Sequence, residues 1–578
     1  GVLAVLTGAE LRVWEDRGRP AGRDSYCMAV DRVRYGGEVV AAVAAETLDA
    51  ARAGCEAIRV EYEPLPVVAD MDQAADEALP RLHDDSPNLV WSWEYRRGEP
   101  ERALAQADRV FEDVFEYPVN HHVTMEPHVC VADAGPDGVR LWTSTRNMYG
   151  VRQEIARMFG YPLAAVQVVV PYVGGAYGSK GYCRLEPIAV ALSLACGRPV
   201  RLCLSMDENF RVSANHAVRV RLRTGVRADG TILARQVEVI VDTGAYSDLG
   251  PLGAGVAQHF AYRSPGPYRI PHLSVRAARA YTNKVPGTAL RGYGAPNVAW
   301  AYESHMEQIA SGLGIDPLEL RLKNLLAPGE EWYPGRLACD GRWEQVLRRA
   351  AEAIGWDRRP EPGSGRGKGL AVAIKNSGGV RTMAHAIVRL HPDESVTVLA
   401  SFTESGQGAR TAMAQIAAQT LGVAAERVRV VTPDTSLTPY DQMTGSSGTT
   451  LVTGRAVQLA AEDVRRQLLE LAGEVLQVPP ERLRVEAGQV ISDGDGRAMR
   501  VGEVLREAFG PGGGELVGHG VCRRRVARGA DPTLYYEFGA GAAEVEVDRE
   551  TGQVRLVRYV AVSDVGRAIH PAQVEGQD

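Results

Sequence analysis

The chain reads Val173-Gly174-Gly175-Ala176-Tyr177-Gly178-Ser179-Lys180 at a glycine-rich turn that follows a run of β-branched residues. The residues before this turn, Val166–Val173, predict a strand, and the residues after it, Leu185–Cys196, predict an apolar helix. Glycines at this density let the backbone approach a ligand closely and direct its N–H groups at anionic oxygens. The spacing fits neither the dinucleotide fingerprint nor the phosphate loop, so a ligand-binding turn and a structural turn both stay open.

Outward from this turn, the spacing of apolar residues predicts a mixture of helices and strands. A helix is expected over Asn147–Phe159 with Gly160 as its C-terminal cap, and a hairpin is expected to turn at Ala228-Asp229-Gly230. Later helices are expected over Ala409–Leu421 and Arg455–Leu476. The predicted class is α+β with several domains, because 578 residues are too many for one hydrophobic core.

The chain is expected to divide into three domains. Residues 1–90 form a small α/β domain in which Val60–Glu63 is a returning strand, and its N-terminus reads as the middle of a strand-and-turn unit, as if truncated. Residues 91–327 and 363–578 form two larger mixed domains. The segment 328–362 is rich in Gly, Pro and charge and is interpreted as a linker.

Composition argues against several kinds of partner. The formal net charge is −7 with acids and bases interspersed, which gives no reason to expect nucleic acid. No apolar run reaches the roughly 18 to 20 residues that span a bilayer, so no membrane partner is expected. The eight cysteines include no C-x-x-C pair, so neither a zinc ribbon nor an iron–sulfur cluster has an obvious ligand set. This cysteine usage fits a reducing cytosol and predicts a cytoplasmic protein.

Two further segments combine glycine with hydroxyl or amide side chains. The segment Glu404–Arg410 opens a helix, whose N-terminus could hold a phosphate while Gln407 suits a pterin edge. A simple capped helix is the alternative there. The run Thr444–Thr450 precedes the Arg455 helix and could hold another phosphate through hydroxyl and N–H groups, although linkers have a similar composition.

Two more segments carry residues with possible chemistry. The segment Thr288–Pro296 places Arg291 beside Tyr293, an exposed cation next to a stacking surface, and the alternative is a surface turn with a solvated arginine. The segment Asn120–His128 gathers three histidines and a glutamate, which suggests a metal site. Adjacent histidines on a strand point to opposite faces, however, so no side chain is assigned as a metal ligand.

No single motif is decisive, but their order along the chain is specific. A Met-Glu-Pro-His segment, the turn at 173–180, the Arg-Gly-Tyr-Gly-x-Pro segment at 291–296, Gly-Gln-Gly, the hydroxyl run, Asp-Val-Gly-x-x-x-x-Pro at 564–571 and Gly576-Gln577 follow one another. In this order they resemble the xanthine dehydrogenase/aldehyde oxidase family over essentially the whole chain. The resemblance implies an α/β hammerhead domain over residues 1–90 and molybdopterin-binding domains over 91–327 and 363–578.

The resemblance also implies an activity. Members are molybdopterin-dependent oxidoreductases whose cofactor holds molybdenum, in bacteria usually as the cytosine dinucleotide. They hydroxylate a small-molecule aldehyde or electron-poor N-heterocycle with water-derived oxygen and pass electrons to iron–sulfur and FAD subunits. A non-catalytic cofactor-binding or assembly protein, or a hydroxybenzoyl-CoA reductase-like member, is the alternative.

Carried over by motif, the resemblance assigns site residues. The turn Gly175, Ala176, Tyr177 and Gly178 would lie against the molybdenum centre, with Asn120 in the place where many relatives have a glutamine near it. Arg291 and Tyr293 would line the substrate pocket. The pterin and its phosphates would be held by Gln407, Gly408, Ser447, Gly448, Thr449 and Gln577.

The sequence also departs from the family pattern. Gly181 stands where purine-oxidising members have a glutamate, which weakens a xanthine assignment, and Gly292 stands where the carbon monoxide dehydrogenase branch has a cysteine. The family's catalytic glutamate follows the Gly-Gln segment, but Asp578 is the last residue, and Gly514-Glu515 comes too early in the order. We therefore expect a C-terminal remainder of the same subunit to supply the glutamate, and little turnover by this chain alone.

Overall fold

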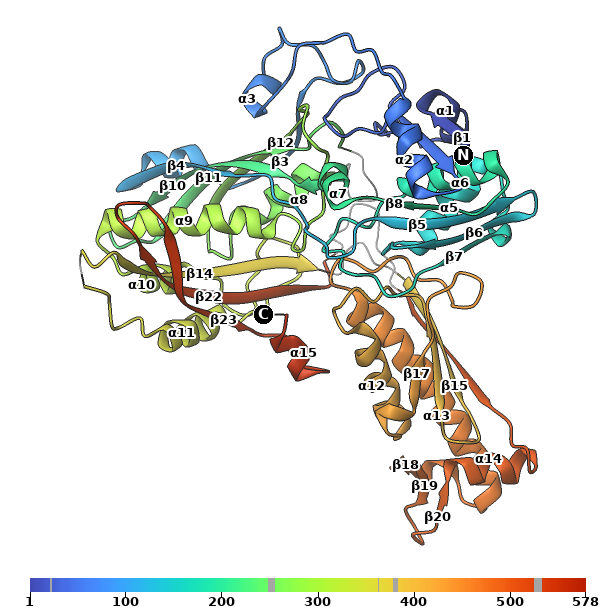
Figure 1. The fold of residues 1–578 in the computed structure, drawn as a ribbon. Helices are drawn as coiled ribbons and strands as arrows, with labels where there is room; N and C mark the ends of the chain where they lie inside the picture. The colour runs from blue at the N-terminus through green and yellow to red at the C-terminus, as the bar shows by residue number, and fades with distance from the viewer. Residues whose placement is uncertain (21–22, 248–254, 362, 378–382, 524–532, 578) are drawn as a thin grey trace.

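The structure is a computed structural model that describes residues 1–578 except 21–22, 248–254, 362, 378–382, 524–532 and 578. Pro362 and Asp578, which end two of the predicted segments, lie outside the described residues. Helices and mixed sheets alternate throughout, which confirms the predicted α+β class (Figure 1). No helix in the described part of the chain is long and apolar enough to cross a bilayer.

The N-terminal unit is a two-stranded antiparallel ladder with short helices. Leu6 and Leu11 belong to an apolar cluster with Leu192 of α6 (Leu185–Cys196), so this cluster fastens the N-terminal unit to the unit that carries this helix. The predicted returning strand over Val60–Glu63 is wrong: these residues are irregular and exposed, and Pro64 and Pro66 after them have no N–H to give to a ladder. The elements are β1 (Val2–Thr7), α1 (Gly8–Glu15), β2 (Ala41–Ala45), α2 (Leu48–Ala57) and α3 (Met71–Ala74).

A five-stranded sheet of order β3-β12-β11-β10-β4 forms the next unit. The β10–β11 hairpin turns at Ala228-Asp229-Gly230 as predicted, with Gly230 at φ +83. The elements are β3 (Leu89–Arg97), α4 (Pro100–Ala105), β4 (Arg109–Tyr117), α7 (Met206–Val212), β9 (Ala214–Asn215), β10 (Ala217–Val226), β11 (Ile232–Asp242), α8 (Val256–Arg263), β12 (His272–Ala280), β13 (Gly287–Thr288), α9 (Ala295–Leu313) and α10 (Pro317–Asn324).

A four-stranded sheet of order β7-β6-β5-β8 carries α5 and α6 beside it. The predicted helix ends are confirmed, because the Asn147 side chain accepts the Gly150 N–H and Gly160 ends α5 in the left-handed conformation. The elements are β5 (Val129–Gly135), β6 (Gly138–Thr143), α5 (Met148–Phe159), β7 (Val166–Val169), α6 (Leu185–Cys196) and β8 (Val200–Cys203).

Strand β7 is shorter than predicted. It ends at Val169, because the next amides donate to a distant part of the chain: Val170 N–H to the Pro433 carbonyl and Val173 N–H to the Glu404 carbonyl. The glycine-rich turn therefore begins where the chain leaves its own sheet and meets the second half of the molecule.

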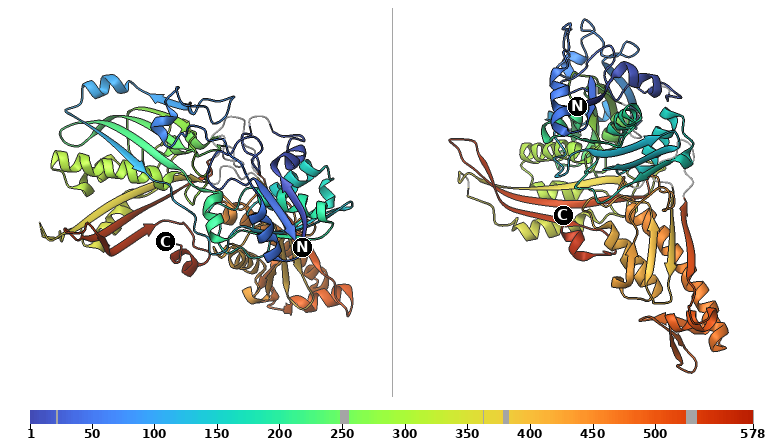
Figure 2. Two further views of the ribbon diagram at one scale, coloured as in Figure 1. Left: turned by 45° about the horizontal axis from the view of Figure 1, so that its top comes forward. Right: turned by 45° about the vertical axis from the view of Figure 1, so that its right-hand side comes forward.

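The second half contains three sheets, of order β14-β22-β23, β17-β16-β15-β21 and β18-β19-β20. The predicted helix over Ala409–Leu421 is confirmed with the same bounds, and the one over Arg455–Leu476 begins one residue earlier. The part carrying α12 to α14 extends away from the rest of the molecule (Figure 2). The elements are α11 (Trp343–Ile354), β14 (Arg366–Ser377), β15 (Met383–Leu390), β16 (Val396–Ala400), α12 (Ala409–Leu421), β17 (Val428–Val430), α13 (Gly454–Leu476), β18 (Leu483–Glu486), β19 (Gln489–Ser492), β20 (Ala498–Arg500), α14 (Val501–Phe509), β21 (Leu516–Arg523), β22 (Tyr535–Val547), β23 (Val554–Ser563) and α15 (Pro571–Glu575).

The two halves share one hydrophobic core. Helix α9 lies between the five-stranded sheet and β14 (Figure 1), and Val298 and Tyr302 of α9 are in one buried cluster with Val372 of β14. Helix α11, which lies within the segment 328–362, buries Trp343 and Leu347 in the same cluster. Because both halves contribute to this core, loops at their junction are held from both sides.

Candidate cofactor and substrate cavity

A cavity of about 600 Å³ lies where the two halves of the molecule meet. Four loops that are far apart in sequence contribute most of its wall, namely Ala176–Gly178, Ala289–Tyr293, Ser405–Gln407 and the hydroxyl run Thr444–Thr450. The remaining lining residues are Arg146, His259, Arg263, Lys375, Asn376, Ser377, Gly576 and Gln577. Each of the four loops belongs to a motif that the sequence analysis identified.

Most of the predicted site residues meet in this cavity. Those that line it are Ala176, Tyr177, Gly178, Arg291, Tyr293, Gln407, Ser447, Thr449 and Gln577. Gly175, Gly408 and Gly448 are chain neighbours of lining residues and do not line the wall themselves. Asn120 is exposed outside it, and its carbonyl accepts the Asn215 N–H at 2.6 Å.

The turn at Tyr177 and Gly178 is locked by its neighbours. Both residues have positive φ, +49 and +129. A Cβ at position 178 would lie 1.9 Å from the Ala289 carbonyl oxygen, so only glycine fits there. The Nε2 of His122 lies 2.9 Å from the same oxygen and must carry the proton, since a carbonyl only accepts. Burial lowers the pKa of His122 to about 4, which keeps the ring neutral.

The Met-Glu-Pro-His segment supports the turn from behind. Glu126 accepts the Gly174 N–H at 3.0 Å and a hydrogen bond from the ammonium of Lys180 at 2.6 Å. The Lys180 side chain is fully buried, and that burial lowers its pKa even though Glu126 opposes the shift. No group of three or more metal-ligating side chains occurs among the described residues. These motif residues therefore act as a brace for the glycine turn.

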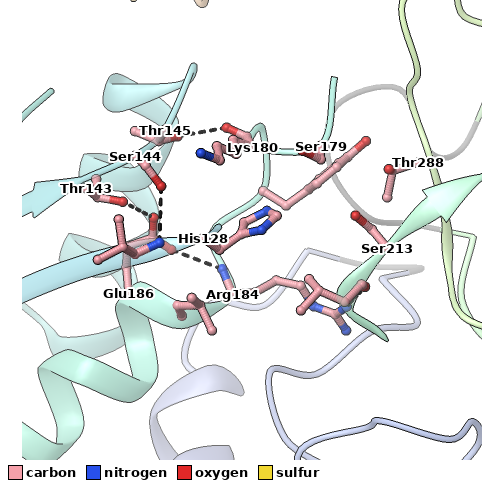
Figure 3. Close-up of a pocket in the computed structure, with 14 residues that line it drawn as sticks. His128, Thr143, Ser144, Thr145, Ser179, Lys180, Arg184, Glu186, Ser213 and Thr288 are labelled. Atoms are coloured by element: carbon pink, nitrogen blue, oxygen red, sulfur yellow. Dashed lines mark hydrogen bonds between the residues drawn. The ribbon is translucent and has the colours of Figure 1, made fainter. Parts of the chain in front are cut away.

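Below the same turn lies a small polar cavity of about 20 Å³, room for one water molecule (Figure 3). It is lined by His128, whose Nδ1 lies 2.6 Å from the Asn209 side-chain oxygen, and by Glu186, which accepts the Thr143 hydroxyl at 2.6 Å. It is too small for a substrate. The Thr145 hydroxyl in its wall donates to the Lys180 carbonyl at 3.3 Å, which positions the loop that carries Lys180 (Figure 3).

Backbone strain is concentrated around the larger cavity. Of the eight described non-glycine residues with positive φ, four line it, namely Tyr177, Tyr293, Ser446 and Ser447. Each such conformation costs about 1 kcal/mol or more and persists only where the surroundings enforce it. The chain continues into a π-helical turn over Thr449–Thr453. Strain and π-turns together are typical of ligand-binding loops.

A half-buried ion pair supports the conformation of Ser447. The ammonium of Lys375 donates to the Ser447 hydroxyl at 3.1 Å and to both carboxylate oxygens of Glu537 at 3.0 and 3.1 Å. The Tyr535 hydroxyl donates to the Ser447 carbonyl at 2.6 Å. Burial acts to raise the pKa of Glu537, but the charge of Lys375 outweighs it together with the hydrogen bonds, so this pKa is lowered. Neither Lys375 nor Glu537 was identified from the sequence.

The Gly-Gln-Gly turn has its amides already occupied. The carboxylate of Glu404 accepts the N–H groups of Gly406, Gly408 and Arg410 at 2.9 to 3.0 Å. Helix α12 therefore begins capped, which selects the capped-helix alternative over a phosphate at its N-terminus. The Gln407 amide donates to the Thr403 carbonyl and keeps a second N–H, and the side chain lines the cavity.

Arg291 and Tyr293 form the opposite wall. Arg291 is exposed, and its guanidinium donates to the Gln577 carbonyl at 3.3 Å. The Tyr293 ring packs edge-on against His259, with ring centroids 5.1 Å apart. Burial lowers the pKa of His259 to about 3, so a neutral ring supports Tyr293. Arg263 holds the Tyr293 carbonyl from behind.

Arg146 was not identified from the sequence, because it lies outside every motif. Its guanidinium donates to the carbonyls of Gly178 and Thr444, both at 3.3 Å. Together with Arg263, Arg291 and Lys375 it makes the lining cationic, and none of the described lining residues is Asp or Glu. A cationic wall with hydroxyl and amide donors fits an anionic heterocyclic cofactor such as a phosphorylated pterin.

Family comparisons agree with this geometry. Residues 82–325 and 348–577 each match the "Molybdopterin cofactor-binding domain", and residues 1–66 match the "Aldehyde oxidase and xanthine dehydrogenase, a/b hammerhead domain". These matches define a molybdopterin-dependent oxidoreductase and confirm the expected hammerhead and two cofactor-binding domains.

Individual relatives cover nearly the whole chain. A probable xanthine dehydrogenase subunit of Bacillus subtilis (strain 168) is 32% identical over 96% of this chain and 74% of its own length. The xanthine dehydrogenase molybdenum-binding subunit of Escherichia coli O157:H7 is 28% identical over 94% of this chain and 73% of its own. Quinoline 2-oxidoreductase from Pseudomonas putida 86 superposes with a TM-score of 0.89 at 29% identity, covering 100% of this chain and 78% of that one. The chain belongs to the xanthine dehydrogenase family, as a molybdenum-cofactor-binding subunit.

Proposed function

We propose that this chain binds the molybdopterin cofactor and the substrate of a molybdenum hydroxylase that oxidises an aldehyde or an electron-poor N-heterocycle with oxygen from water. The supporting observation is the cavity of about 600 Å³, in which motifs from both halves of the chain meet. When bound, the cofactor accepts the two electrons that leave the substrate. The chain's own residues bind, orient and shield the reacting groups.

The strained loops form the cofactor side of this proposal. Backbone N–H groups at Tyr177 and Gly178 face the metal end, while Ser447 and Thr449 hold the pterin and its phosphate through hydroxyl groups, with Gln407 and Gln577 beside them. Because Lys375 and Glu537 already fix Ser447, these donors need little reorganisation when the cofactor binds. Preorganised donors of this kind stabilise charge more effectively than mobile ones.

Arg291 and Tyr293 form the substrate side. A flat electron-poor ring or an aldehyde can lie against Tyr293, and the Arg291 guanidinium stabilises negative charge that develops on the substrate. Gly181 stands where purine-oxidising relatives are expected to have a glutamate, and the Arg146 guanidinium fills the space beside it, 2.6 Å from an ideal Cβ. A purine is therefore a less suitable substrate than other heterocycles. The described lining offers no carboxylate as a proton acceptor, so no residue of this wall is given that role.

A second cavity supports the dinucleotide form of the cofactor. It has a volume of about 920 Å³ and shares Ser447 and Thr450 with the first cavity. Arg455, Arg465 and Arg567 contribute to its wall, which suits a second phosphate and a nucleotide. We propose that the cofactor extends from the first cavity into the second as the cytosine dinucleotide. Release of CMP on acid treatment of the purified enzyme would support this, and release of pterin alone would contradict it.

Electrons are proposed to leave through iron–sulfur and FAD subunits. Support comes from the family and from relatives that are named as subunits of larger enzymes. The cytosol is proposed as the compartment, since the described cysteines form no disulfide with one another.

The decisive experiment uses the enzyme that contains this chain, purified with its associated subunits. Molybdenum, iron and FAD contents are measured, and dye-linked oxidation is assayed with benzaldehyde, nicotinate and hypoxanthine. Molybdenum together with oxidation of an aldehyde or a heterocycle supports the proposal. A bound pterin with no turnover of any of the three substrates would instead indicate a cofactor-binding or assembly protein.

A further inference from the structure

Arg146 is a cation that the cofactor loops surround without neutralising. Its polar partners among the described residues are the carbonyl oxygens of Gly178 and Thr444, with the Tyr182 hydroxyl nearby. None of these groups carries a charge, and no carboxylate of the described residues forms an ion pair with Arg146. Burial lowers its pKa, yet a guanidinium stays protonated at neutral pH.

Two glycines make room for this side chain. A Cβ at Gly181 would lie 2.6 Å from one terminal nitrogen of Arg146, and a Cβ at Gly445 would lie 2.7 Å from the other. Neither glycine has positive φ, so backbone freedom does not explain the residue type. The missing Cβ atoms do, because any side chain at either position would displace the guanidinium from the cavity wall.

The other cations of the wall have different arrangements. Lys375 is neutralised by Glu537 and reaches Ser447 on the phosphate side of the proposed cofactor site. Arg263 is buried behind Tyr293 and hydrogen-bonds Asn376. Arg146 instead reaches Gly178, in the turn proposed to face the metal end. A desolvated and uncompensated cation at this place is costly unless an anion binds it.

We infer that Arg146 binds an anionic oxygen of the substrate, so that the enzyme acts on aldehydes or N-heterocycles that carry a carboxylate. This inference rests on the proposed function, because it assigns the substrate class of the same cavity. Arg291, exposed on the opposite wall, would then act on the reacting part of the substrate, while Arg146 holds the carboxylate. A planar guanidinium can bind both carboxylate oxygens at once, which fixes the orientation of an aromatic ring.

The test compares benzoate with benzamide, which match in size and differ in charge. Dissociation constants are measured by isothermal titration calorimetry on the purified enzyme. We expect benzoate to bind at least about tenfold more tightly than benzamide, since a hydrogen bond to a charged group is worth about one to two powers of ten in affinity. Arg146→Gln should abolish this preference with molybdenum content unchanged, and Arg146→Lys should retain part of it.

Arg336→Gln, an exposed arginine in another part of the chain, is the control and should leave both affinities unchanged. Equal binding of benzoate and benzamide by the unaltered enzyme overturns the inference, and so does a preference that survives Arg146→Gln. If Arg146→Gln loses pterin and molybdenum while Arg146→Lys keeps them, the anion belongs to the cofactor, which also overturns it. A clear benzoate preference without oxidation of any substrate would overturn the proposed reaction and leave the anion site standing.

Discussion

The carbonyl oxygen of Ala289 occupies the place where a side chain of residue 178 would begin, 1.9 Å from an ideal Cβ on Gly178. Both residues line the cavity, one from each of two loops more than a hundred positions apart. The same oxygen accepts the hydrogen bond of His122. The contact therefore fixes the spacing between the turn proposed to face the metal and the loop that carries Arg291.

Replacing Gly178 with alanine should separate these two loops. Gly178→Ala forces the carbonyl away and also places an L residue at φ +129, so we expect most of the bound molybdenum to be lost. The measurement is metal content of the purified enzyme beside its thermal melting curve. Gly329→Ala is the matched control, since Gly329 has φ +91 but nothing within 4 Å of its Cβ position. Similar metal loss in both variants would show that strain, and not the contact, is responsible.

Removing Glu126 should destabilise the protein by leaving Lys180 buried without a partner. For Glu126→Ala we expect a loss of roughly 3 kcal/mol in the free energy of unfolding, the low end for a broken buried pair, because Glu126 still reaches solvent. Urea denaturation measures the change. Glu344→Ala removes an exposed partner of Arg348 and should cost about 0.5 kcal/mol or less. Equal losses of unfolding free energy in the two variants would show that the Glu126–Lys180 pair stabilises the protein no more than an exposed ion pair does.

Acid should destabilise the loops through His122. Its pKa falls from 6.5 to about 4 on folding, so between these values the unfolded chain binds more protons than the folded one. The free energy of unfolding must then decrease as the pH falls through this window. Between neutral pH and pH 5, protonation of this residue in the unfolded chain should lower the free energy of unfolding by roughly 2 kcal/mol.

The pH test compares the unaltered protein with His122→Gln, which keeps a donor for Ala289. The difference in unfolding free energy between pH 7.5 and pH 5 should shrink by roughly 2 kcal/mol in the variant. His519→Gln, on an exposed position of β21, should leave the profile unchanged. An unaltered pH profile in His122→Gln would show that His122 does not cause the loss of stability in acid.

Replacing Arg291 should lower kcat/KM more for heterocyclic substrates than for small aldehydes. Its guanidinium is exposed and donates to the Gln577 carbonyl at 3.3 Å, a long and weak hydrogen bond, so it can turn toward a bound heterocycle. We expect Arg291→Ala to lower kcat/KM about tenfold for a heterocycle and less for acetaldehyde, as for the loss of one charge-assisted hydrogen bond. Steady-state kinetics on both substrates checks this. An equal loss for both would exclude Arg291 from orienting the ring.

Much of the fold can be predicted from local signals. The caps Asn147 and Gly160 define helix α5, and apolar spacing defines helices α6 and α12, because these signals act within a few residues. Strand β7 is shorter than its sequence predicts because the amides beyond Val169 donate to the distant carbonyls of Pro433 and Glu404, contacts that local sequence does not reveal.

The site is predictable only in part, for the same reason. Ordered motifs identify the loops of Gly178, Arg291 and Ser447, since each has a recognisable composition. The roles of Arg146, Glu404 and Glu537 depend on which backbone groups and side chains they meet in the folded chain. Neither composition nor spacing along the chain reveals those contacts, because they form only when the two halves pack together.

The hydrogen bonds between the two halves also determine when the cavity can form during folding. Arg146 bonds to Thr444 and Thr403 bonds to Thr145 across separations of 298 and 258 residues, so these bonds can close only after both halves have been synthesised and have folded. The walls of the cavity do not exist before that moment. Because Val298 and Tyr302 of one half and Val372 of the other belong to one buried cluster, the core and the cavity walls are completed in the same step, when the two halves pack together.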